Sequence, residues 1–279
     1  MSKKYFIGVS GWSHPEWKGA FLPEKLNPTI SELQFYSRFF NVVETATTFY
    51  HPQSADASRR WLEETAHRPD FRFVVKLWQK LVEEQSPYEL EDVQRVCSGL
   101  DVLLESGKLG ALLLAFPAAF DFSLENRSWL FRLKTTFKKY PIVAELQHAS
   151  WSKKDAQIFL GEQAVHRLES FSTKHVEDES HGTQDVRFFR LAGLNSDESE
   201  LREFLAEASK SFANENFLVF SAESGVASVK AAFQARAEIE KQKVVMPKEM
   251  LLAEPDLLEI GMTEHTDQLD FFDAFTKRP

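Results

Sequence analysis

Short runs of consecutive apolar residues alternate along this sequence with longer stretches in which apolar positions recur every three or four residues. An uninterrupted apolar run predicts a strand that is covered on both faces, whereas the three-to-four spacing predicts an amphipathic helix. Strands are expected at 5–10, 42–46, 71–77, 109–116, 142–145, 165–169, 186–191 and 217–220. Helices are expected at 29–40, 87–105, 123–139, 153–162, 197–212 and 226–241, and one more from Ser54 or Asp56 to Thr65.

Eight strands that alternate with helices, at spacings of roughly 25 to 35 residues, predict an α/β fold of the (β/α)₈ TIM-barrel type. An open doubly wound sheet is the alternative, but neither a G-x-G-x-x-G nor a G-x-x-x-x-G-K-[ST] turn follows the first strand. We therefore expect one barrel domain over 1–241 and a C-terminal extension or tail over 242–279. The polar stretch 170–184 lacks a helical pattern, which predicts a degenerate sixth crossover.

Composition supports a large core and argues against several classes of partner. Hydrophobic residues make up 43% of the 279 residues, and 25 of them are Phe. The net charge of −9 opposes direct binding to nucleic-acid phosphates. No apolar run reaches the ~18 residues of a membrane span, so no membrane contact is expected. The single cysteine, Cys97, has no partner for an internal disulfide, and a cytoplasmic location is expected.

The stretch 141–151 carries the clearest chemical signal. Its apolar residues Ile142, Val143 and Ala144 lead directly into Glu145, and His148 and Trp151 follow. Carboxylates are seldom buried unless something pairs with them or uses them. A carboxylate at the end of a buried strand therefore indicates either an ion-pair network or a binding site.

Ionisable residues stand at the ends of several other predicted strands. The loops after barrel strands build the active face of a TIM barrel, so these residues are expected to converge. If the site is catalytic, Glu44, Glu145 and His148 would carry the acid/base work. The predicted ligand-binding residues are Lys76, Arg190, Trp12, Tyr50 and Trp151. The alternative is that the two carboxylates and two cations neutralise each other as a structural network.

Histidines near the same loops do not form a recognisable metal motif. His14, His51 and His148 could join a glutamate, but no local spacing of the H-E-x-x-H kind supports such a site. We expect neither a metal nor another cofactor.

Four separated motifs resemble the YecE-like family, which is domain of unknown function 72. They read GVSGWSHPEW at 8–17, VETATTFY at 43–50, FRFVVK at 71–76 and ELQHASW at 145–151. The resemblance extends over roughly 7–233. It implies a TIM barrel, and it implies no activity because the chemistry of that family is unassigned.

Several strand ends depart from the pattern of that family. Ala46 and Ala115 stand where the family has Asn and Gln, Ala192 replaces His, and Gln147 replaces Arg. The chain also has Val82-Glu83 in place of Thr-His and Ser221-Ala222 in place of Asn-Asn. Each key donor lost from an oriented site costs about 3 kcal/mol of transition-state stabilisation. The departures therefore predict a divergent member, a candidate pseudoenzyme with altered or absent catalysis.

The tail indicates a different kind of function. Gln268, Leu269, Phe271 and Phe272 resemble the Gln-Leu-x-Leu-Phe peptide by which bacterial proteins dock on the DNA polymerase sliding clamp. An amide followed by large apolar side chains can anchor an extended peptide in preformed pockets. The alternative is that these apolar side chains pack back on the barrel.

The sequence therefore predicts one of two functions. The first is binding of a small polar or anionic molecule at the C-terminal face of the barrel, with or without hydrolase- or lyase-type acid/base chemistry. The second is a non-catalytic adaptor that docks on the sliding clamp through 268–272.

Overall fold

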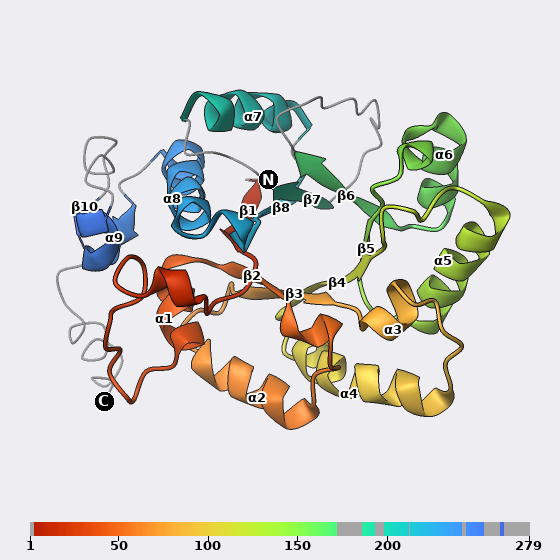
Figure 1. Ribbon diagram of the computed structural model, residues 1–279, viewed down its shortest axis with the longest axis horizontal. Coiled ribbons are helices and arrows are strands. Elements are labelled where there is room, and N and C mark those ends of the chain that lie inside the picture. The colour runs from red at the N-terminus through yellow and green to blue at the C-terminus, as the bar shows by residue number, and fades with distance from the viewer. Residues whose placement is uncertain are drawn as a thin grey trace.

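Eight parallel strands form one sheet that rolls into a nearly closed barrel, with helices around its outside (Figure 1). The computed structural model describes residues 3–171, 186–192, 198–211, 213–241, 244–253 and 263–264. The strand order is β1-β8-β7-β6-β5-β4-β3-β2. The strands are β1 (Lys4–Val9), β2 (Val42–Thr45), β3 (Arg72–Lys76), β4 (Leu109–Ala115), β5 (Ile142–Glu145), β6 (His166–Phe171), β7 (Val186–Leu191) and β8 (Glu215–Phe220). The predicted TIM barrel is confirmed.

Helices connect the strands and cover the barrel from outside. They are α1 (Glu32–Phe39), α2 (Ala55–Glu64), α3 (Gln79–Val82), α4 (Leu90–Glu105), α5 (Leu124–Thr136), α6 (Lys154–Glu162), α7 (Glu198–Ser211), α8 (Val226–Glu240) and α9 (Lys248–Ala253). Short 3-10 turns are η1 (Pro15–Trp17), η2 (Thr47–Phe49), η3 (Ala149–Ser152) and η4 (Ala222–Ser224). The sequence did not predict α3, which is a single turn too short to show helical spacing.

Serine caps explain where three of the helices begin. The hydroxyls of Ser31, Ser54 and Ser123 accept the backbone N–H three residues later, at the starts of α1, α2 and α5. A serine that accepts this bond satisfies a donor with no partner inside the helix. For this reason α1 begins at Glu32 and not at 29, where the apolar spacing alone would start it.

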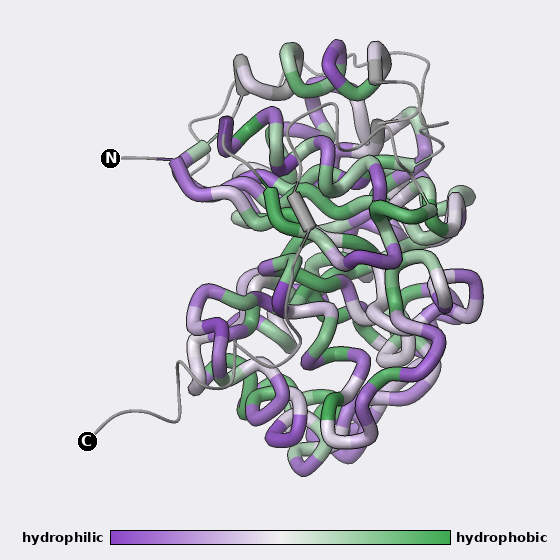
Figure 2. The backbone as a smooth tube through the Cα atoms, turned by 90° about the vertical axis from the view of Figure 1, so that its left-hand side faces the viewer, coloured by the Kyte–Doolittle hydropathy of each residue, from purple (hydrophilic) through white to green (hydrophobic). Residues whose placement is uncertain are grey.

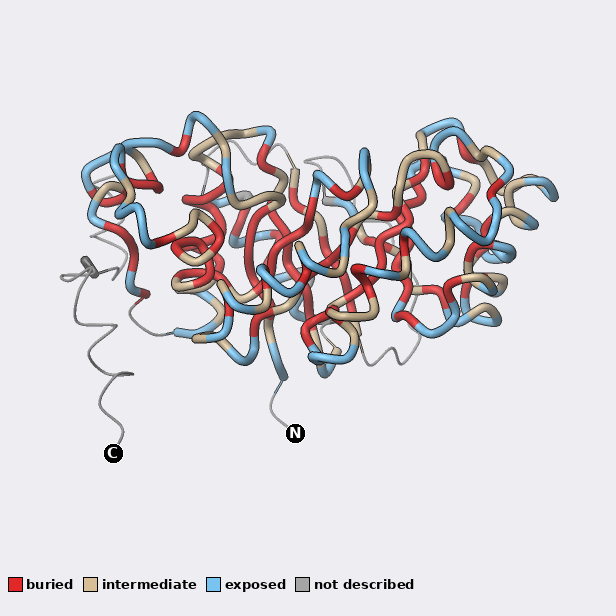
Figure 3. Tube along the Cα trace, turned by 90° about the horizontal axis from the view of Figure 1, so that it is seen from below, coloured by how far each residue is buried: buried red, intermediate tan, exposed pale blue. Residues whose placement is uncertain are grey.

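Alternation along the strands divides the apolar residues between two clusters. One lies inside the barrel, where the rings of Phe6, Phe217 and Phe188 stack with centroids 4.5 and 4.6 Å apart. The larger cluster fills the space between the strands and the surrounding helices. Hydrophobic segments accordingly run through the interior in Figure 2, and the strands in Figure 3 are mostly buried between exposed helices and loops.

The junction between β1 and β2 is closed by side chains over much of its length. The hydroxyl of Tyr36 accepts the N–H of Val9 at 2.7 Å and donates to the carbonyl of Val42 at 2.8 Å. A Cβ atom at Gly8 would lie only 2.5 Å from this hydroxyl and 2.0 Å from the Val42 carbonyl oxygen, so glycine is required there. At the mouth the two strands meet directly, because the N–H of Gly11 donates to the carbonyl of Glu44 at 2.8 Å.

The hydrophobic core continues beyond 241 into the predicted C-terminal extension. Val244, Met246 and Met250 are buried within the larger cluster. A short strand β9 (Val245–Met246) pairs in parallel with β10 (Thr263–Glu264), separately from the barrel. Residues 172–185 of the predicted degenerate crossover and residues 268–272 of the docking motif lie outside the described residues. In the described part of the chain, no helix combines the length and the apolar character needed to cross a bilayer.

Candidate functional site

Charged residues form a layer at the C-terminal end of the barrel interior. Val42, Val74, Val143 and Phe188 belong to the inner apolar cluster of β2, β3, β5 and β7. Because side chains alternate along a strand, the residue two positions later points to the same side. The residues two positions after these four apolar residues are all charged. They are Glu44, Lys76, Glu145 and Arg190, and we call them the mouth network.

Arg190 lies at the centre of the mouth network. Its guanidinium donates one hydrogen bond to Glu44 and another to Glu145. The Lys76 ammonium lies 3.2 Å from the other oxygen of Glu44, and the Gln147 amide donates to the other oxygen of Glu145, also at 3.2 Å. All four carboxylate oxygens therefore have a donor, and the network links four strands.

Burial is deepest at Glu44 and least at Lys76. The side chains of Glu44 and Glu145 are 1% and 9% exposed, whereas that of Lys76 is 23% exposed. Burial acts to raise the pKa of Glu44, but Arg190 and Lys76 outweigh it, so the pKa lies below its ordinary value. Burial acts to lower the pKa of Arg190, and the two glutamates outweigh it and raise the pKa. Glu44 is therefore ionised and Arg190 protonated at neutral pH.

The loop after β2 is fastened to the end of β3, which positions Lys76. The hydroxyl of Thr48 in η2 donates to the backbone carbonyl of Lys76 at 2.9 Å and lies 2.8 Å from the hydroxyl of Thr45. The next residue, Phe49, places its ring centroid 6.0 Å from the ammonium of Lys76. Phe49 is one of the aromatic residues that the sequence places on the loops at the mouth, whereas Thr48 was given no role although it lies only four residues after Glu44.

The predicted aromatic ligand contacts differ in how accessible they are. Tyr50 is 58% exposed and meets Phe49 edge to face at 5.5 Å. Trp12 is half-buried and packs edge to face on Trp61. Trp151 is fully buried, and its indole N–H donates to the Phe120 carbonyl at 2.7 Å. Tyr50 is therefore the most accessible of the three predicted contacts, and Trp151 supports the wall of the barrel.

His148 is exposed and, among the described residues, makes no hydrogen bond to the mouth network. Its Nδ1 lies 2.8 Å from the hydroxyl of Ser150 and accepts the Ser150 backbone N–H at 3.3 Å. The Phe122 N–H donates to the same hydroxyl at 2.7 Å, which leaves the hydroxyl hydrogen for Nδ1. His148 thus caps η3 through Nδ1, and its predicted proton-transfer role stays a prediction.

The described histidine and acidic side chains outside the mouth network make separate contacts. Within the ranges the structure describes, no group of three or more His, Cys, Asp or Glu side chains is arranged to hold a metal ion. His14 hydrogen-bonds the carbonyl of Ser10 at 2.9 Å, and His51 is exposed.

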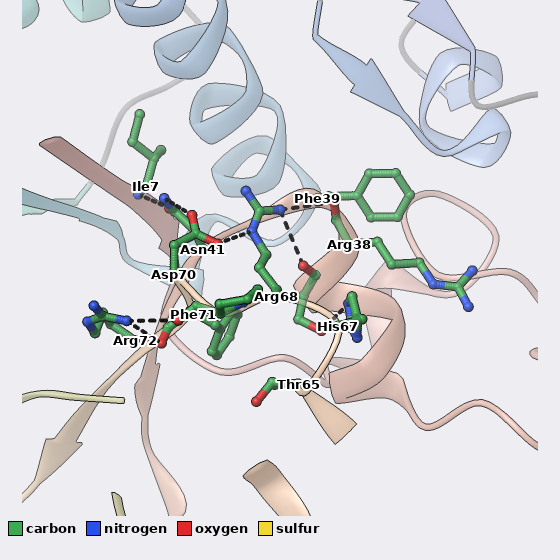
Figure 4. A network of polar contacts seen from close by, with 12 residues as sticks. Ile7, Arg38, Phe39, Asn41, Thr65, His67, Arg68, Asp70, Phe71 and Arg72 are labelled. Carbon is green, nitrogen blue, oxygen red and sulfur yellow. Dashed lines mark hydrogen bonds and ion pairs between the residues drawn. The ribbon is translucent and has the colours of Figure 1, made fainter. Parts of the chain in front are cut away.

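A second polar network occupies the opposite, N-terminal end of the barrel (Figure 4). Arg68 donates to the carbonyls of Ser37 and Arg38 at 3.3 and 3.1 Å. Lys108 donates to the carbonyls of Thr65 and Arg68 at 2.5 and 3.1 Å. The carbonyls lie in the last turn of α1 and just beyond α2, where a helix leaves acceptors without internal partners. We call this set, with Arg236 donating to the carbonyl of Phe39, the N-terminal network.

Comparison with known proteins identifies the relatives of this chain. The profile of the family described as "Protein of unknown function DUF72" matches residues 6–254. The chain is 31% identical to the UPF0759 protein YunF of Bacillus subtilis (strain 168) over 153 residues, 52% of this chain and 51% of YunF. It is 38% identical to the UPF0759 protein YecE of Escherichia coli (strain K12) over 71 residues, 25% of this chain and 22% of YecE. The matched region thus spans about half of YunF and less of YecE.

Solved structures agree with the fold. A crystal structure of a DUF72 family protein from Thermotoga maritima MSB8 superposes with a TM-score of 0.72 at 24% identity, covering 85% of this chain and 99% of that one. One from Enterococcus faecalis V583 gives a TM-score of 0.71 at 20% identity, covering 85% and 95% of the two chains. At these identities the likeness concerns the fold alone.

Proposed function

The chain belongs to the family described as Protein of unknown function DUF72, and from this premise we propose that it binds a small polar or anionic molecule at the C-terminal face of its barrel. The supporting observation is the mouth network. Its four charged side chains, as far as the structure describes the chain, hydrogen-bond and ion-pair only with other side chains.

Burying four charged side chains costs free energy of folding, so such a network is expected to persist where it also serves a function. Moving an ion out of water costs several kcal/mol even after the protein relaxes, and replacing a buried ion pair by apolar groups is often neutral or stabilising. Within the described ranges, the charges at the mouth satisfy no helix end and no strand edge. Their retention at the functional end of a TIM barrel therefore favours a role in binding.

The four side chains suit different parts of that role. Lys76 is the most exposed, and Glu44 is the one carboxylate it pairs with among the described residues. Two of its three N–H donors are thereby left for a ligand. Because Glu44 stays ionised at neutral pH, it holds the cations in place and does not serve as a proton donor. Acid/base chemistry of the hydrolase or lyase type would use Glu145, because its side chain is 9% exposed whereas that of Glu44 is 1% exposed.

A thermal-shift screen of a metabolite library tests this function. A ligand held at the mouth raises the melting temperature of the wild-type protein, because it binds only the folded state. The same compound loses its effect on Glu145→Gln and keeps it on Glu162→Gln, a matched change of an exposed glutamate at the end of α6. Shifts that survive Glu145→Gln unchanged would place the binding elsewhere and refute the proposal.

The adaptor function is a second proposal that rests on the sequence of 268–272 alone. A peptide of these residues, titrated against a sliding clamp beside a scrambled peptide, measures it directly. Binding of the native peptide alone would support docking. Equal binding of both peptides, or none at high micromolar concentration, would remove the clamp from consideration.

A further inference from the structure

We propose that the molecule bound at the mouth is uncharged and rich in hydroxyl groups, as a sugar or sugar alcohol is. This inference rests on the proposed function, because it specifies the ligand of the same site. Three features of the mouth network support it: its balance of charge, its balance of donors and acceptors, and the exposed aromatic surface beside it.

The charges of the mouth network cancel. Two carboxylates and two cations are joined in one series, from Lys76 to Glu44, then Arg190, then Glu145. An incoming anion meets as many carboxylates as cations, and so does an incoming cation. Burying a charge is unfavourable unless an opposite charge compensates it, and no charge in this series is left over for that purpose. A neutral molecule avoids the problem.

The hydrogen-bonding capacity of the network is balanced as well. Each oxygen of Glu44 and Glu145 accepts one described hydrogen bond or ion pair, whereas a carboxylate offers about four lone-pair sites in all. Glu44 is 1% exposed and out of reach, so the carboxylate that can accept further hydrogen bonds from a ligand is Glu145, and the Lys76 ammonium can donate two. A hydroxyl group both donates and accepts, so adjacent hydroxyls can bind a carboxylate and the ammonium at once. A carboxylate or phosphate group on the ligand can only accept.

An exposed aromatic side chain lies on the loop that contacts Lys76. Tyr50 is 58% exposed and packs on Phe49, whose ring centroid lies 6.0 Å from the Lys76 ammonium. Binding sites for small molecules commonly join a few placed polar groups to aromatic walls. The C–H face of a sugar ring can lie on such a wall while its hydroxyls reach the charged groups.

A charge series on one carbon frame tests the inference. The probes are neutral hexoses, pentoses and hexitols, with the uronates and amino sugars of the same frames, titrated calorimetrically into the full chain at slightly acidic pH. At least one neutral compound is expected to bind the wild type about tenfold more tightly than its charged counterparts, because the network offers no net compensating charge.

Substitutions within the network are expected to move this preference in opposite directions. Lys76→Met leaves a net negative charge and should favour the amino sugar, whereas Glu145→Gln leaves a net positive charge and should favour the uronate. Lys138→Met removes an exposed cation between α5 and the start of β5, at the end of that strand opposite Glu145, and should leave the order of affinities unchanged.

The outcomes separate this inference from the proposed function. Tightest binding of a uronate by the wild type, lost in Lys76→Met, would overturn the neutral ligand and keep the binding site. Failure of every neutral compound to bind would also overturn the inference. The proposed function would then be judged separately, by whether any compound of the metabolite library depends on Glu145.

Discussion

At the N-terminal end of the barrel Arg68 and Lys108 donate hydrogen bonds to main-chain carbonyls, whereas at the C-terminal end Arg190 donates to two carboxylates. Both ends bury cations in polar surroundings. Beside the side-chain oxygens of Asp70, Thr65 and Glu240, the N-terminal network has acceptors that are backbone carbonyls, and these must be satisfied whatever side chains surround them. The acceptors of the mouth network are themselves side chains, and substitution can remove them together with the cations.

We therefore expect the cations of the N-terminal network to be required for folding and the charges of the mouth network to be kept for binding. Removing a cation from the N-terminal network leaves a carbonyl that no second substitution can delete. Removing all the charges from the mouth network leaves nothing unsatisfied.

The largest loss of stability is expected from Arg190→Met. The substitution leaves Glu145 buried without a cation and Glu44 with Lys76 alone. Breaking a buried pair by removing one partner costs about 3–5 kcal/mol in the free energy of unfolding. Urea unfolding measures this loss, and adding Glu145→Gln should recover most of it by restoring neutrality. Failure of the second substitution to recover stability would show that the mouth network is needed for folding.

A smaller loss, without recovery, is expected from Lys108→Met in the N-terminal network. Lys108 is only 8% exposed and donates to the carbonyls of Thr65 and Arg68 and to the Thr65 hydroxyl. The two carbonyls keep the backbone N–H groups of Arg68 and Phe71, so what is lost is hydrogen bonds from a buried charged group, worth about 1.5–3 kcal/mol. Urea unfolding of Lys108→Met and of Lys108→Met with Thr65→Val should give no recovery in the double variant. Full recovery would contradict the distinction between the two ends.

The smallest effects are expected from pH, which acts on the two networks in different ranges. His67 lies next to the N-terminal network, with its Nε2 3.3 Å from the Ser37 hydroxyl (Figure 4). Burial, with Arg38 and Arg68 nearby, lowers the pKa of His67 below its ordinary 6.5. The unfolded chain then takes up a proton first, so the stability from this group is present above pH 6.5 and lost on acidification. The pKa of Glu44 is also lowered, so its contribution is present above pH 4.5 and lost only further below.

Unfolding measured against pH should therefore show two separable contributions. His67→Gln should flatten the curve on the acid side of pH 6.5, and Glu44→Gln should flatten it below 4.5. If His67→Gln flattened the curve below pH 4.5, or Glu44→Gln flattened it just below pH 6.5, these two pH ranges would not belong to the two ends of the barrel.

The sequence predicted the strands and the charges at their ends because both follow local rules. Apolar runs locate the strands, and alternation carries Glu44 and Arg190 to the inside whatever the loops do. It could not place Trp151, since proximity to a strand end does not show whether a side chain faces the mouth or the outer core. The acid/base and ligand-binding roles of the predicted residues stay predictions.

The N-terminal network was missed for a different reason. Lys108 binds a carbonyl that lies 43 residues away in sequence, and Arg68 binds carbonyls that lie 31 and 30 residues away. No local spacing in the sequence therefore predicts these contacts. One weak indication was present, because Lys108 follows Gly107 directly before an apolar strand.

The central claim is that the charges of the mouth network are kept for binding and not for folding. The most direct test is the free energy of unfolding of one variant in which Glu44, Glu145, Lys76 and Arg190 all become Met. Replacing a buried ion network as a whole by apolar groups of similar volume is often neutral or stabilising by about 1–4 kcal/mol, so we predict stability equal to or above that of the wild type. A variant less stable by about 3–5 kcal/mol, the loss expected when a single buried charge is orphaned, would contradict the account.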